Sequence, residues 1–110
     1  MVFGIERIRF LEERWREVAE VVLREGRRVA DVKEAVVFGS VVKGKAMGAS
    51  DLDIALVVRG GGWRERELLL KIHSLLPDEI SEIIDLSIIR EEEEQEFLKF
   101  AGEYVIISIA

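Results

Sequence analysis

The sequence predicts an α/β (α+β) fold, in which a small mixed β-sheet of about four strands is packed against helices. Some segments have apolar residues at helical spacing, whereas others are short apolar runs bounded by glycine, proline or charged residues, as is typical of strands. Such a mixture favours helices packed on a sheet. A chain of 110 residues without an internal repeat or a linker is expected to form a single domain, 1–110.

The first half of the chain predicts one helix and two strands. The helix has apolar residues at every third or fourth position and frays near Gly26. The residues that define this apolar stripe are Ile5, Ile8, Leu11, Trp15, Val18 and Val22. Strands are then expected at residues 36–38 and 53–58, and a triple glycine at 60–62 ends the second of them.

The second half predicts two helices and two strands. A helix over residues 64–76 is stopped by Pro77, and a strand is expected at 83–89. Residues 91–101 form the next helix, whose leading glutamates are expected to be a solvated helix start. The last strand, 104–109, is apolar on both faces, which indicates an interface with a second copy or with a helical partner.

Composition restricts the classes of function. The net charge of −6 argues against a long nucleic acid as ligand, because phosphate neutralisation requires clustered Lys and Arg. The absence of cysteine excludes disulfides and thiolate metal sites, and it fits the cytoplasm. The chain has no Asn or Thr and is 35% charged, which favours a thermophilic source. No apolar run approaches the roughly 20 residues of a membrane span.

The segment from residue 36 to residue 58 contains the most informative pattern. An apolar run ends in Gly39-Ser40, a turn that can offer backbone N–H groups and a hydroxyl to a phosphate. Asp51 and Asp53 then open a second apolar run, and two residues that are two apart in a strand point to the same face. Like charges held this close usually have a counter-cation. A phosphate site beside metal-binding carboxylates indicates nucleotide chemistry.

This spacing resembles the GSxxxGxxxxxSDxD signature of the DNA polymerase beta-like nucleotidyltransferase superfamily, in its minimal single-domain (MNT) form. The matching positions are Gly39, Ser40, Gly44, Ser50, Asp51 and Asp53. The third carboxylate of the family lies on a later strand, for which Asp85 is the candidate. The family often has Ala-Arg before the second glycine, whereas Val42 and Lys43 stand here. Lysine keeps the charge but loses the planar fork of arginine.

The resemblance implies a metal-dependent nucleotidyltransferase that uses ATP or another nucleoside triphosphate. Asp51, Asp53 and Asp85 would hold two Mg²⁺ ions, and Asp85 would also be the general base. The triphosphate would bind to a group formed by Gly39, Ser40 and Lys43. In this family, minimal members are commonly antitoxins paired with a HEPN-type helical toxin. Such a member could transfer AMP to its partner, block the partner by occlusion alone, or, as a further alternative, modify a small molecule.

Other interpretations of these residues are weaker. Residues 39–46 nearly match a Walker A loop, but Ala46 replaces the magnesium-ligating hydroxyl and no long helix follows. An EF-hand loop starting at Asp51 lacks the required glycine and the terminal glutamate. Asp51 and Asp53 could each be a structural cap or a solvated strand end. His73 is expected to be a packing residue, and Tyr104 fits either a strand position or a partner contact.

Overall fold

A computed structural model of the chain describes residues 4–44 and 51–109. Its elements, in chain order, are α1 (Gly4–Arg27), β1 (Val32–Phe38), β2 (Leu52–Val58), α2 (Glu65–Leu75), α3 (Asp78–Ser81), β3 (Ile84–Arg90), the 3₁₀ turn η1 (Glu91–Glu93), α4 (Glu94–Ala101) and β4 (Tyr104–Ile107). The predicted mixed sheet with packed helices is confirmed. No helix in these described ranges is long and apolar enough to cross a membrane.

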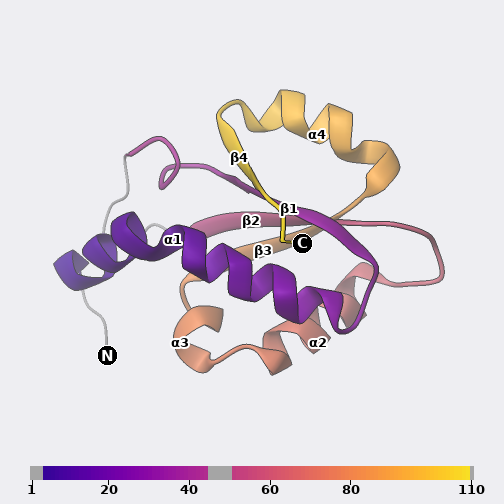
Figure 1. Ribbon diagram of the computed structural model, residues 1–110, viewed down its shortest axis with the longest axis horizontal. Helices are drawn as coiled ribbons and strands as arrows, with labels where there is room; N and C mark the ends of the chain where they lie inside the picture. The colour runs from indigo at the N-terminus through magenta and orange to yellow at the C-terminus, as the bar shows by residue number, and fades with distance from the viewer. Residues whose placement is uncertain (1–3, 45–50, 110) are drawn as a thin grey trace.

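The strands form one sheet in the order β3-β2-β1-β4 (Figure 1). β1 pairs antiparallel with both β2 and β4, whereas β2 and β3 are parallel. Parallel neighbours need a crossover connection, which here contains α2 and α3. The parallel pairing aligns the beginnings of β2 and β3, and this alignment positions the candidate site.

One face of the sheet, called the α1–α2 face below, carries most of the core. α1 and α2 lie against this face (Figure 1). Alternate side chains of each strand pack there against the apolar stripes of the two helices. Its fully buried members from β1 and β2 include Ala35, Val37, Ile54, Leu56 and Val58. The sequence predicted helices packed on the sheet, because the apolar stripes of α1 and α2 are long and regular.

The opposite face, called the α4 face, is partly covered by α4 (Figure 1). It has a smaller apolar cluster. Val36, Ala55 and Val57 are its buried centre. The Phe38 and Phe97 rings meet edge to face with their centroids 5.2 Å apart, which packs α4 against β1. α4 has only eight residues and cannot cover the whole sheet.

β1 begins four residues before its predicted start at residue 36, because its charged residues have tertiary partners. The Nζ of Lys33 lies 2.7 Å from Glu94 Oε1. The Arg27 side chain bonds the carbonyls of Val32 and Lys33, at 3.1 and 3.0 Å, and that of Ile109 at 2.5 Å. Arg27 thus ties the end of α1 to β1 and to the segment that follows β4.

Two smaller differences concern helices. Residues 78–81 form α3, a single turn directly after Pro77 that the sequence did not predict. Proline is well suited to the start of a helix, since it has no N–H to satisfy there. The helix expected at 91–101 begins instead as the 3₁₀ turn η1 and becomes α-helical at Glu94.

Candidate functional site

The parallel β2–β3 pair brings Asp53 and Asp85 side by side. Their Cα atoms are register partners near the beginning of both strands. Side chains alternate along a strand, so Asp53 points to the same face as Ala55 and Val57, which is the α4 face. Asp85 is the register partner of Asp53, so its side chain lies on that face too. Asp53 is half-buried and Asp85 is exposed. Two carboxylates from distant parts of the sequence therefore meet on one partly open surface.

The electrostatics of this pair are unfavourable for two free carboxylates. Burial raises the pKa of Asp53, and the charges of Asp85 and Asp51 raise it further. Asp51 directly precedes β2 and is half-buried, close enough to act on Asp53 through its charge. Such a group either retains a proton or is compensated by a cation. Carboxylate oxygens are donors that suit Mg²⁺.

Gly39 ends β1 in a conformation that brings the backbone against Asp53. Its φ is +83°, and a Cβ there would overlap the Oδ2 of Asp53 and lie 3.0 Å from its Cγ. Glycine is the residue that combines a positive φ with so close an approach. The turn therefore depends on glycine because of the carboxylate beside it.

The rest of the predicted phosphate group lies in the turn after Gly39. Ser40 is half-buried and Lys43 is exposed. The turn is closed by the N–H of Lys43, which donates to the Gly39 carbonyl at 3.3 Å, and by the N–H of Gly44, which donates to the Val41 carbonyl at 3.1 Å. Gly44 also has a positive φ of +71°. Ser50 lies outside the described residues.

The structure thus pairs Asp53 with Asp85 and puts Asp51 and Gly39 next to Asp53. Within residues 4–44 and 51–109, no three or more His, Cys, Asp or Glu side chains form a group arranged to hold a metal ion. The assignment of Asp51, Asp53 and Asp85 as metal ligands, and of Gly39, Ser40 and Lys43 as phosphate ligands, stays a prediction.

A second carboxylate pair on the α4 face was not predicted. Glu94 was expected in a solvated helix start, yet it is only 3% exposed. Its burial would raise its pKa, but hydrogen bonds from Glu34 and Lys33 outweigh burial and lower the pKa. The pKa of Glu34 rises to about 7, first because its carboxyl hydrogen-bonds to Glu94 and then because of burial. Four consecutive glutamates give no sequence signal for which one is buried.

His73 was expected to be a packing residue, and Tyr104 either a strand residue or a partner contact. The Nδ1 of His73 lies 2.7 Å from the Ser81 Oγ, an interaction that joins α2 to α3. His73 is half-buried on α2. Tyr104 begins β4, pairs with Phe38 of β1 and is 39% exposed.

The comparisons with known proteins agree with this geometry. A crystal structure titled a "putative nucleotidyltransferase" from Sulfolobus solfataricus superimposes with a TM-score of 0.65 over 91% of this chain and 85% of that one. The identity is 18%, so this likeness shows the fold alone. A search of curated proteins found no match.

The family assignment rests on the sequence match. Residues 20–107 match the family model described as "Polymerase beta, Nucleotidyltransferase". That span includes β1 to β4, the glycine turn and all three candidate carboxylates. The chain therefore belongs to the polymerase beta family of nucleotidyltransferases.

Proposed function

We propose that this chain is a minimal nucleotidyltransferase that moves a nucleoside monophosphate, AMP when ATP is the donor, to a hydroxyl of a partner protein. The observation that carries the proposal is the Asp53–Asp85 pair beside Gly39. A carboxylate pair and a glycine turn at adjacent strand ends are the parts that a metal–triphosphate complex requires.

The donor set fits Mg²⁺. Asp53 and Asp85 offer hard oxygen ligands, and Asp51 stands close to Asp53. Burial and the neighbouring charges of Asp85 and Asp51 raise the pKa of Asp53, and a divalent cation would favour its ionised form. When bound, the metal supplies neutralisation of the triphosphate and lowers the pKa of the attacking hydroxyl.

The chain's own residues have separate roles in the proposed step. The turn after Gly39 orients the β and γ phosphates, with the Ser40 hydroxyl as donor and the Lys43 ammonium as counter-charge. Asp85 is exposed and accepts the proton of the acceptor hydroxyl. The acceptor oxygen forms a bond to the α phosphorus, and the bond from that phosphorus to the bridging oxygen of pyrophosphate breaks.

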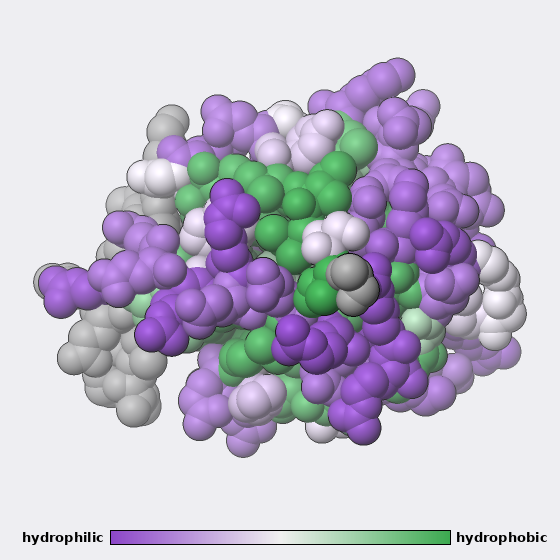
Figure 2. All heavy atoms as spheres, viewed as in Figure 1, coloured by the Kyte–Doolittle hydropathy of each residue, from purple (hydrophilic) through white to green (hydrophobic). Residues whose placement is uncertain are grey.

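A protein acceptor is supported by exposed apolar surface. Apolar atoms gather between α1 and α4 (Figure 2). On β4, the side chains of Tyr104 and Ile106 are 39% and 42% exposed. Phe100 of α4 is 83% exposed. Such surface is typical of protein interfaces. We propose that the partner is a helical HEPN-type ribonuclease, which this chain restrains as an antitoxin.

The same apolar surface favours a second candidate function. The chain could bind the ribonuclease and block it by occlusion, without any transfer. In that case the partner would bind equally well when the carboxylates are replaced, since none of them contributes to the apolar surface.

The test is incubation with labelled ATP and Mg²⁺, with and without the protein encoded by the adjacent gene. We expect label on that protein, and loss of labelling in Asp53→Asn and Asp85→Asn. Asp78→Asn is the matched control, because Asp78 is exposed on α3. α3 lies on the side of the sheet opposite to α4 (Figure 1). Unchanged labelling in Asp53→Asn and Asp85→Asn would contradict the proposal, and binding without labelling would select occlusion.

A further inference from the structure

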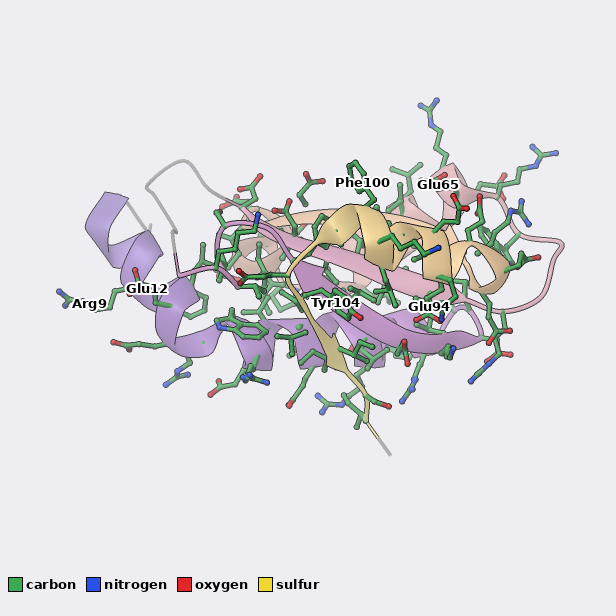
Figure 3. The ribbon with its side chains drawn as sticks, turned by 90° about the horizontal axis from the view of Figure 1, so that it is seen from above. Arg9, Glu12, Glu65, Glu94, Phe100 and Tyr104 are labelled. Atoms are coloured by element: carbon green, nitrogen blue, oxygen red, sulfur yellow. The ribbon has the colours of Figure 1, made fainter. Side chains whose placement is uncertain are left out.

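An open groove lies between α4, the outer strand β3 and the beginning of α2. Its volume is about 430 Å³. Its apolar lining consists of Ile88 and Ile89 of β3 and of Phe97 and Phe100 of α4. Phe100 and Glu65, the first residue of α2, lie on the same side of the molecule (Figure 3).

The groove follows the free edge of the sheet. Ile88 and Ile89 are consecutive, so they point to opposite faces, and a groove lined by both lies at the outer edge of β3. The N–H of Leu52 donates to the Ile83 carbonyl at 2.8 Å, so odd-numbered residues of β3 direct their backbone groups towards β2. The backbone groups of Leu86 and Ile88 therefore face outward, where an added strand could pair with them.

The rim of the groove is acidic. Glu65, Glu93 and Glu96 line it and are exposed. Among the described residues, none of the three forms an ion pair with Lys or Arg. The whole chain has a net charge of −6. An occupant with positive charges beside an apolar side chain would complement both the acidic rim and the apolar lining.

We propose that this groove binds an extended, basic segment of the partner protein, which pairs with the edge of β3 and places an apolar side chain between Phe97 and Phe100. Strand addition of this kind takes affinity from backbone hydrogen bonds and specificity from alternate side-chain pockets. A second copy of this chain is a poorer occupant, because it also has a net charge of −6 and its β4 edge, 104–107, has no Lys or Arg.

The position of the groove connects docking with transfer. Asp85 and Ile89 face the same side of β3 and are about 13 Å apart at the usual rise of a strand. A bound segment that continued along β3 would bring a hydroxyl-bearing residue to Asp85. This connection rests on the proposed function, whereas the docking itself does not.

The docking is tested by binding alone, with the full chain and without ATP or Mg²⁺. The probe is a short synthetic peptide in which lysine and isoleucine alternate, followed by fluorescence anisotropy. A lysine–glycine peptide of equal length and charge measures the general electrostatic attraction. We expect Phe100→Ser to weaken binding of the isoleucine peptide about tenfold, the scale for loss of a buried aromatic anchor. Leu70→Ser is the matched control, since Leu70 is 63% exposed on α2 and does not line the groove.

Charge is tested by reversal. Glu96→Lys should weaken binding, and the effect should decrease at high salt. Glu12→Lys should not, because Glu12 lies on α1, away from Phe100 and Glu65 (Figure 3). Circular dichroism checks that each variant is folded.

The outcomes separate the two proposals. Equal losses in Phe100→Ser and Leu70→Ser, or equal binding of the two peptides, would overturn the docking site. A dimer of the wild type that Phe100→Ser dissociates would assign the groove to a second copy and also overturn the proposal. Asp53→Asn should bind the peptide normally and lose transfer. Unchanged transfer in this variant, with normal peptide binding, would contradict only the proposed function.

Discussion

The two faces of the sheet differ in what their strand residues contribute. On the α1–α2 face, the inward side chains of β2 are apolar and buried from Leu52 to Val58. On the α4 face, the same strand has Ala55 and Val57 at one end but Asp53 at the other. The α1–α2 face stabilises the fold through apolar side chains alone. The α4 face combines a small apolar core with carboxylates that are costly to bury. Substitutions on the two faces should therefore have different effects.

The largest effect on folding is expected on the α1–α2 face. Leu56 is fully buried there, and Leu56→Ala should lower the free energy of unfolding by about 2–5 kcal/mol, because it leaves a cavity. Ile106→Ala on β4 is the comparison, since Ile106 is 42% exposed and should cost less than about 1 kcal/mol. Urea denaturation measures both. Similar losses would mean that the α1–α2 face does not dominate stability.

Gly39→Ala should affect both stability and the site. The positive φ costs an alanine about 1–2 kcal/mol, and its Cβ would displace the Asp53 carboxylate. Expressed as free energies, the loss of nucleotidyl transfer should exceed the loss of folding stability. Gly61→Ala is the control, because a Cβ there meets no atom within 4 Å and its φ is not positive. Full transfer by Gly39→Ala would show that the contact with Asp53 is not needed.

The Glu34–Glu94 pair makes the α4 face sensitive to pH. The folded-state pKa of Glu34 is raised to about 7, so its contribution is complete below the unfolded pKa and is lost as pH rises through about 7. Lys33 also contacts Glu94, and Glu91 contacts both Lys33 and Arg59. Stability should therefore decline between about pH 6 and pH 8 by roughly 1 kcal/mol, the scale of one hydrogen bond.

Glu34→Gln should remove this decline. The amide of glutamine can donate to the Glu94 carboxylate at every pH, whereas the glutamate donates only when protonated. Thermal unfolding at pH 6 and pH 8 measures the difference. Glu92→Gln is the control, since Glu92 is exposed in η1. A decline that is the same in Glu34→Gln as in the wild type would exclude Glu34 as its source.

The smallest change in stability is expected for Asp53→Asn. The folded-state pKa of Asp53 is raised, so the ionised group disfavours the folded state as pH rises through that pKa. Without metal at neutral pH, the amide should leave the free energy of unfolding unchanged or raise it by a few tenths of a kcal/mol. A clear loss of stability in urea denaturation would show that Asp53 has a structural role.

Much of the fold could be predicted from local patterns. The periodic stripe of α1 and the apolar runs of β2 and β3 are strong signals, because each element buries one face along its length. The position of Asp85 beside Asp53 follows from two strands that begin with carboxylates at similar offsets and pair in parallel. The start of β1 was missed because Lys33 and Glu34 are charged, and their partners on α4 are distant in sequence. The burial of Glu94 was missed for the same reason.

The central place of β1 has a consequence for the order of folding. Residues 39–51 connect β1 to β2, whereas residues 39–103 lie between β1 and β4. The β1–β2 pairing therefore closes a much smaller loop than the β1–β4 pairing does. Contacts of high sequence separation form late when loop closure limits the rate. The nascent sheet would therefore pass through a three-stranded stage in which the edge of β1 is bare and Glu34 is hydrated. In the finished protein the same segment, β4 with α4, is the one whose amide hydrogens should exchange first.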